Sequence, residues 1–135
     1  MTEDLKKIND YKVIKLLIVD NCETVRQSIK SIMEVEDNIE IIGEAVNGIK
    51  AVELSSKLNP DVILMDLIMP EMGGLEATRI INKKNPSIKI IALTGLNGNG
   101  KKQEILKAGA SFYFSKDRLS IEELIKEIKI PKIFS

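Results

Sequence analysis

Short apolar runs alternate along this chain with stretches whose apolar residues recur every three or four positions. The first pattern predicts buried strands and the second predicts amphipathic helices. The expected strands are residues 13–19, 39–46, 62–65, 88–93 and 111–114. The expected helices are residues 23–35, 49–58, 75 up to the Asn85-Pro86 pair, a stretch between Gly100 and Gly109, and 121–128. This alternation predicts an α/β fold in which a mainly parallel sheet is covered by helices on both faces.

The length of 135 residues and the hydrophobic content of 44% predict a single domain with its own core. Residues 1–12 are polar and are expected to form a tail or a short helix. The domain is expected to cover residues 13–130, with a C-terminal tail at 131–135 after Pro131 ends the regular structure.

Chemically useful side chains stand where the expected strands end. The strand ends are Asp20-Asn21, Val46-Asn47, Asp66, Thr94 and Lys116. Right-handed crossovers bring the carboxyl ends of parallel strands to one edge of the sheet, where ligands bind. In a flavodoxin-like (βα)5 doubly wound sheet of strand order 2-1-3-4-5, the first and third strands are neighbours, so Asp20 and Asp66 should face each other.

Two facing carboxylates repel unless one is protonated or a cation lies between them. Oxygen ligands without any histidine favour a hard divalent ion, and Mg²⁺ fits best. Lys116 and Thr94 in the same cleft suit an oxyanion. A carboxylate beside Mg²⁺ and an ammonium group is a suitable acceptor for a phosphoryl group, which would give an aspartyl phosphate.

Charge and composition narrow the other possibilities. Lysine plus arginine equals aspartate plus glutamate at 20 each, so no net charge draws the chain to nucleic acid or to a membrane surface. No apolar run has the length of a membrane span, and the single cysteine, Cys22, favours a reducing compartment. We therefore expect a cytoplasmic domain that does not itself bind nucleic acid or membrane.

The motifs resemble those of a known family. They are residues 17–20 (LIVD), residues 62–66 (VILMD) with Met69-Pro70 and Gly73-Gly74, residues 92–94 (ALT), and residues 108–110 (AGA) before Tyr113 and Lys116. In this order and spacing they are similar to the receiver domain of two-component response regulators, over roughly residues 14–129. The resemblance implies a signalling switch rather than an enzyme that acts on other molecules.

The resemblance also implies residue roles. Asp66 would be the phosphoacceptor, Lys116 would bridge to the phosphoryl group, Thr94 would turn inward to bond a phosphoryl oxygen, and Tyr113 would be the aromatic switch that follows it. The implied Mg²⁺ ligands are Asp20, Asn21, Asp66 and the backbone carbonyl of Ile68. The phosphoryl donor would be a partner histidine kinase.

The resemblance leaves the output open. Phosphorylation would be read out on the face of the fourth and fifth strands and helices. The target would be a downstream protein or a C-terminal output domain. Many receivers have proline at the position of Asp117. The absence of that proline resembles the subfamily that carries a helix-turn-helix DNA-binding output domain. A phosphorylation-dependent homodimer is a further expectation. The chain is either a single-domain regulator or the receiver portion of a longer protein.

One departure from the family pattern keeps an alternative open. The acidic pair after the first strand is usually two acids, whereas here it is Asp20-Asn21, which should weaken Mg²⁺ binding. The alternative is a degenerate receiver that binds proteins without being phosphorylated. A haloacid-dehalogenase-type phosphatase is disfavoured because Ile68 stands where its general acid would be. Ile68 and Leu96 cannot position an attacking water, so autodephosphorylation should be slow.

Overall fold

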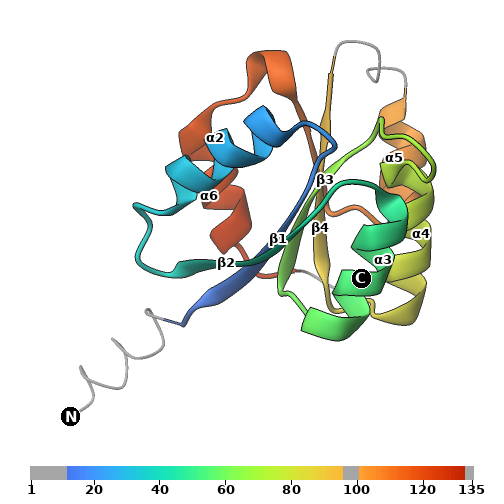
Figure 1. The fold of residues 1–135 in the computed structure, drawn as a ribbon, viewed down its shortest axis with the longest axis horizontal. Helices are drawn as coiled ribbons and strands as arrows, with labels where there is room; N and C mark the ends of the chain where they lie inside the picture. Colours follow the sequence, from blue (N-terminus) through green and yellow to red (C-terminus); the bar gives the residue numbers. More distant parts are fainter. Residues whose placement is uncertain (1–11, 96–100, 133–135) are drawn as a thin grey trace.

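The described part of the chain is a five-stranded parallel sheet between two layers of helices (Figure 1). The computed structural model describes residues 12–95 and 101–132. The tail or short helix expected at residues 1–12 therefore lies outside the described residues except for Lys12, as do residues 96–100, including Leu96, and residues 133–135.

The strands agree closely with those expected from the apolar runs. They are β1 (Ile14–Val19), β2 (Ile39–Ala45), β3 (Val62–Asp66), β4 (Lys89–Thr94) and β5 (Phe112–Ser115). All neighbouring strands run parallel, in the order β2-β1-β3-β4-β5. The predicted flavodoxin-like strand order 2-1-3-4-5 is confirmed.

Helices cover both faces of the sheet. The described α-helices are α2 (Glu23–Met33), α3 (Gly48–Leu58), α4 (Gly74–Lys84), α5 (Lys102–Ala108) and α6 (Ile121–Lys129). Helices α2 and α6 pack on one face, and α3, α4 and α5 pack on the other (Figure 1). Alternate residues of a strand point to opposite faces, so Leu17 lies in the core under α3 to α5 and Leu16 in the core under α2 and α6.

Some element boundaries differ from the expected ones. Asp66, expected just beyond its strand, is the last residue of β3 because its backbone pairs with Leu93 of β4. Helix α2 ends at Met33, two residues early, because the apolar stripe stops there and Val35 is exposed. Strand β5 ends one residue late, and Lys116 opens a short 3₁₀ helix, η2 (Lys116–Arg118).

Strand β2 carries one extra residue. Leu16 of β1 pairs with Ile41, but the next residue, Leu17, pairs with Gly43, so Ile42 forms a bulge. A Cβ on Gly43 would lie 2.9 Å from Cδ1 of Leu58, so glycine lets α3 pack closely on this strand. Strand β2 is one of the two edges of the sheet, next to β1 alone.

Candidate functional site

The carboxyl edge of the sheet brings Asp20, Asp66 and Lys116 into contact. Val19 of β1 and Met65 of β3 are paired, so the residues that follow them, Asp20 just after β1 and Asp66 at the end of β3, lie side by side. Lys116 follows β5 and lies between them. Its Nζ is 2.8 Å from Oδ2 of Asp20 and 3.2 Å from Oδ1 of Asp66. The predicted convergence of these three side chains is confirmed.

Burial and mutual charge perturb the ionisation of this cluster. Asp20 is 2% exposed and Asp66 is 5% exposed. Burial raises the pKa of the Asp66 carboxyl, and the negative charge of Asp20 raises it further. The Lys116 ammonium and a backbone hydrogen bond from Ile68 act in the opposite direction without cancelling the shift. Additional positive charge beside Asp66 would therefore favour its ionised form.

For the Lys116 ammonium group, the neighbouring charges outweigh the effect of burial on the pKa. Burial alone would lower the pKa of its ammonium group, but the hydrogen bond to Asp20 and the charges of both carboxylates outweigh burial and raise it. Lys116 is thus a fixed cation, and its side chain, which is 30% exposed, links the buried carboxylates to the surface.

Thr94 and Tyr113 lie on the next two strands of the sheet. Thr94 ends β4, is fully buried, and its hydroxyl donates to the backbone oxygen of Gly95 at 3.2 Å. Tyr113 lies in β5 opposite Ala92 of β4, two pairs before Thr94 meets Ser115. It is half-buried and packs against the core under α3 to α5. Tyr113 therefore lies on the strand that leads to Lys116, and Thr94 lies on the strand beside it.

The residues expected to hold Mg²⁺ fit this ion only in part. Among residues 12–95 and 101–132, no group of three or more Asp, Glu, Cys or His side chains could hold a metal ion. Asp20 and Asp66 supply two carboxylates, which are the hard oxygen donors that Mg²⁺ prefers. Further donors must be Asn21, which is exposed, a backbone carbonyl such as that of Ile68, or water. Such a site fits Mg²⁺, because this ion keeps several of its waters when it binds to a protein. The site carries one negative charge fewer than a site with two adjacent acids.

The loop after Asp66 is held by close backbone contacts that the sequence motif did not explain. The amide of Gly74 donates to the Leu67 oxygen at 3.0 Å, and that of Gly48 donates to the Met72 oxygen at 2.7 Å. A Cβ on Gly74 would lie 2.1 Å from the backbone oxygen of Asp66. Only glycine permits this approach, so the start of α4 supports the backbone of Asp66.

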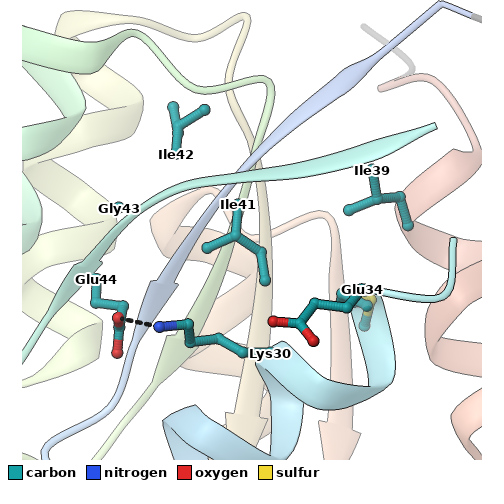
Figure 2. Close-up of a pocket in the computed structure, with 8 residues that line it drawn as sticks. Lys30, Glu34, Ile39, Ile41, Ile42, Gly43 and Glu44 are labelled. Carbon is teal, nitrogen blue, oxygen red and sulfur yellow. Dashed lines mark hydrogen bonds and ion pairs between the residues drawn. The ribbon is translucent and has the colours of Figure 1, made fainter. Parts of the chain in front are cut away.

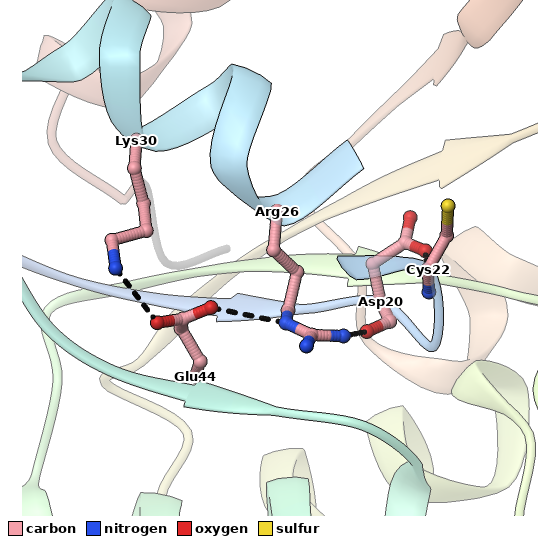
Figure 3. A network of polar contacts seen from close by, with 5 residues as sticks. All are labelled: Asp20, Cys22, Arg26, Lys30 and Glu44. Atoms are coloured by element: carbon pink, nitrogen blue, oxygen red, sulfur yellow. Dashed lines mark hydrogen bonds and ion pairs between the residues drawn. The ribbon is translucent and has the colours of Figure 1, made fainter. Parts of the chain in front are cut away.

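A second polar network, not foreseen from the sequence, lies behind Asp20 (Figure 3). Arg26 of α2 donates through Nη1 to the backbone oxygen of Asp20 at 2.7 Å and through Nε to Glu44 of β2 at 3.0 Å. The other Glu44 oxygen accepts from Lys30 at 3.0 Å. The sequence does hint at this network, because Glu44 is an acid inside an expected strand and such an acid needs a cationic partner. The sequence does not show which helix supplies that partner.

A groove of about 360 Å³ lies beside this network on the open edge of β2 (Figure 2), and neither Asp66 nor Lys116 lines it. Its wall combines Ile39, Ile41 and Ile42 with Lys30 and Glu44, which point toward each other. The ionic groups of this groove, Lys30 and Glu44, already pair with one another. The cluster of Asp20, Asp66 and Lys116 is therefore the stronger candidate for chemistry.

Comparisons with known proteins agree with this geometry. Residues 16–129 match the profile of the response regulator receiver domain. The chain is 35% identical over 125 residues to the transcriptional regulatory protein DegU of Brevibacillus brevis, covering 93% of this chain and 52% of that protein. It is 47% identical over 106 residues to the transcriptional regulatory protein YdfI of Bacillus subtilis (strain 168), covering 78% of this chain and 49% of that protein.

A solved structure supports the same assignment. The response regulator domain of Thermotoga maritima CheB superposes with a TM-score of 0.80 and 32% identity, covering 87% of this chain and 95% of that one. The chain spans about half the length of the curated relatives named above. No helix in residues 12–95 or 101–132 is long and apolar enough to cross a membrane. Profile, relatives and fold together show that this chain belongs to the receiver domain family of two-component response regulators.

Proposed function

We propose that this receiver domain is a phosphorylation switch whose phosphoacceptor is Asp66. The observation that carries the proposal is the pair of buried carboxylates of Asp20 and Asp66 with the Lys116 ammonium within 3.2 Å of both. A carboxylate fixed beside a cation at the edge of a parallel sheet is a suitable nucleophile for phosphoryl transfer.

The transfer is a single displacement at phosphorus. A carboxylate oxygen of Asp66 forms the new P–O bond while the P–N bond of a phosphohistidine on a partner kinase breaks. The leaving imidazole keeps the bonding electron pair and takes a proton from solvent. Lys116 neutralises charge on the phosphoryl oxygens by staying protonated, which its raised pKa favours. Small phosphoanhydrides such as acetyl phosphate would react in the same way, with acetate as the leaving group.

Mg²⁺ is the proposed cofactor, and it would be held by Asp20, Asn21, Asp66 and the backbone carbonyl of Ile68. When bound, the ion supplies positive charge that neutralises the phosphoryl oxygens during transfer. Asp20 is already oriented for this role, because its Oδ1 accepts from the Cys22 amide at 2.9 Å and its Oδ2 contacts Lys116. Asn21 contributes at most a neutral oxygen, so we expect the affinity for Mg²⁺ to be weak.

Thr94 and Tyr113 are the proposed switch residues. Thr94 is fully buried at the end of β4, where a small rotation of its hydroxyl away from the Gly95 oxygen would make it available to a phosphoryl group on Asp66. Tyr113 lies half-buried on the neighbouring strand and would respond to that movement. The response is a shift between two conformations of β4, β5 and their helices, which a partner would detect.

The proposed partners follow from the family and from the length of the relatives. A sensor histidine kinase would donate the phosphoryl group. DegU and YdfI are named as transcriptional regulatory proteins and are about twice as long as the matched region. The output would therefore be a C-terminal DNA-binding domain of the whole protein or a separate downstream protein, and the phosphorylated domain would form a homodimer.

One observation favours a second candidate function, a protein-binding module that works without phosphate. With Asn21 in place of an acid, no group of three acidic side chains in the described residues could hold the metal ion. In that case Lys116 would remain the permanent counter-ion of both carboxylates, and the domain would have a single conformation.

Incubation with acetyl phosphate and Mg²⁺, followed by intact-mass measurement, separates the two functions. We expect a single phosphoryl adduct on the wild type and none on Asp66→Asn. Asp61→Asn is the matched control, since Asp61 is an exposed aspartate just before the same strand, where it accepts from the Lys15 amide. The switch requires that this control keep the adduct. If the wild type forms no adduct and shows no Mg²⁺-dependent response to beryllofluoride, the binding module is the correct function.

A further inference from the structure

The backbone of the Asp20 loop is held from behind by a partly buried arginine, Arg26 (Figure 3). The Asp20 amide donates to the Ala45 oxygen at 3.0 Å, and its carbonyl accepts from Nη1 of Arg26 at 2.7 Å. The carboxylate on the other side of the residue faces Lys116. Both backbone groups of Asp20 are therefore fixed while its side chain faces the phosphorylation site.

Arg26 is itself fixed by an ion pair. Its side chain is 12% exposed, and its Nε lies 3.0 Å from Glu44 on β2. Hydrogen bonding from Lys30 lowers the pKa of the Glu44 carboxyl, and although burial opposes this, the bond from Arg26 lowers it further. Glu44 is therefore a stable anion. The planar guanidinium of Arg26 connects β2 to the Asp20 loop, because its hydrogen bonds to Glu44 and to the Asp20 carbonyl leave in directions fixed by its geometry.

We propose that Arg26 is a positioning residue for the phosphorylation site, which holds the Asp20 loop so that its carboxylate faces Asp66 and Mg²⁺. The inference rests on the proposed function above. The exposed Asn21 leaves Asp20 as the sole acid of its pair, so the orientation of this one carboxylate decides how well the loop binds the ion. Residues behind a metal ligand commonly act in this way.

The positive charge of Arg26, taken by itself, would weaken Mg²⁺ binding rather than support it. A cation near the site repels Mg²⁺, so removal of the charge alone would tighten binding. Lys30 offers a matched comparison, because it also donates to Glu44 at 3.0 Å and also carries one positive charge, but its hydrogen bond goes to the Glu44 carboxylate and not to the Asp20 carbonyl. Arg26→Met and Lys30→Met thus remove the same charge from the same acid, and only the former frees the Asp20 carbonyl.

The test measures Mg²⁺ affinity and the hydrogen exchange of the Cys22 amide, both by NMR, in the full chain. We expect Arg26→Met to weaken Mg²⁺ affinity about tenfold. It should also speed exchange of the Cys22 amide, which donates to Oδ1 of Asp20. Lys30→Met should leave both within about twofold of the wild type, a change of under half a kcal/mol in binding. Arg26→Lys, which keeps the charge and one donor, should fall between the two.

Three results would overturn the inference. Tighter Mg²⁺ binding in Arg26→Met would show that its charge matters and its position does not. Equal effects of Arg26→Met and Lys30→Met would show a general electrostatic or stability effect. Unchanged Cys22 exchange in Arg26→Lys and Arg26→Met, with native circular dichroism, would show that the loop needs no support. The exchange measurement requires no metal, so it distinguishes failure of this inference from failure of Mg²⁺-dependent phosphorylation.

Discussion

Among the residues that the structure describes, Lys116 is the one cation that contacts both buried carboxylates, so its removal is the most informative single change at the site. Lys116→Met retains the apolar stem and deletes an ammonium group 2.8 Å from Asp20 and 3.2 Å from Asp66. Two neighbouring carboxylates, both almost fully buried, then lose their shared counter-ion.

The magnitude follows from the burial of the three groups. Breaking a buried ion pair by removing one partner costs about 3–5 kcal/mol, whereas an exposed pair contributes about 0–1 kcal/mol. Lys116 is 30% exposed, so solvent screens part of its interaction. We expect a loss of about 2–3 kcal/mol in the free energy of unfolding at pH 7.

The loss should depend on pH in a defined direction. The folded-state pKa of Asp66 is already raised, and loss of Lys116 removes the charge that holds it down. Between the unfolded and folded pKa values of Asp66, the folded protein binds a proton that the unfolded chain has released. Stability therefore falls as pH rises through that interval. The defect of Lys116→Met should be largest at neutral pH and should shrink as the solution is acidified.

Urea unfolding followed by far-ultraviolet circular dichroism between pH 5 and pH 8 measures this effect. Lys50→Met is the control, because Lys50 is an exposed lysine paired with Glu53 at 3.3 Å and should change stability by less than about 0.5 kcal/mol. A Lys116→Met protein as stable as the wild type at pH 7, or a defect that does not shrink on acidification, would refute this account of the cluster.

Four further outcomes are expected. Asp66→Asn should raise the urea midpoint at neutral pH, because ionisation of a carboxyl with a raised pKa costs stability there; a lower midpoint would contradict this. Asn21→Asp should tighten Mg²⁺ binding in an NMR titration, and an unchanged titration would remove Asn21 from the metal site. Lys89→Met should lower the free energy of unfolding by about 3 kcal/mol, since Nζ of this buried lysine lies 2.6 Å from Oε2 of Glu127. A variant that unfolds at the same urea concentration as the wild type would contradict this. Ile68 is 59% exposed and cannot orient water, so the phosphorylated protein should persist for minutes or longer after desalting, whereas loss within seconds would show another route for water.

The sequence predicted the strand order and the convergence of Asp20, Asp66 and Lys116 because both depend on local signals. Hydrophobic periodicity fixes which segments are strands, and a polar residue that ends an apolar run must lie at the rim. Right-handed crossovers then bring these strand ends together. Each step uses residues that are close in the chain or a rule of topology that holds for all parallel sheets.

Contacts between distant charged side chains were not predictable in the same way. Arg26 and Glu44 are 18 positions apart, and Lys89 and Glu127 are 38 apart. The chain contains 20 cationic and 20 acidic residues, so composition alone allows many pairings. Which pairs form depends on helix rotation and on the β2 bulge at Ile42, and neither is encoded in a local pattern.

Mapping the phosphorylated residue tests the central claim most directly. After incubation with acetyl phosphate and Mg²⁺, reduction with borohydride converts an aspartyl phosphate to homoserine, which peptide mass spectrometry locates. The account predicts homoserine at position 66, dependent on Mg²⁺ and absent from the Asp66→Asn protein. Homoserine at Asp20 or Asp61, or a peptide spanning position 66 that stays unmodified while intact mass shows an adduct, would contradict it.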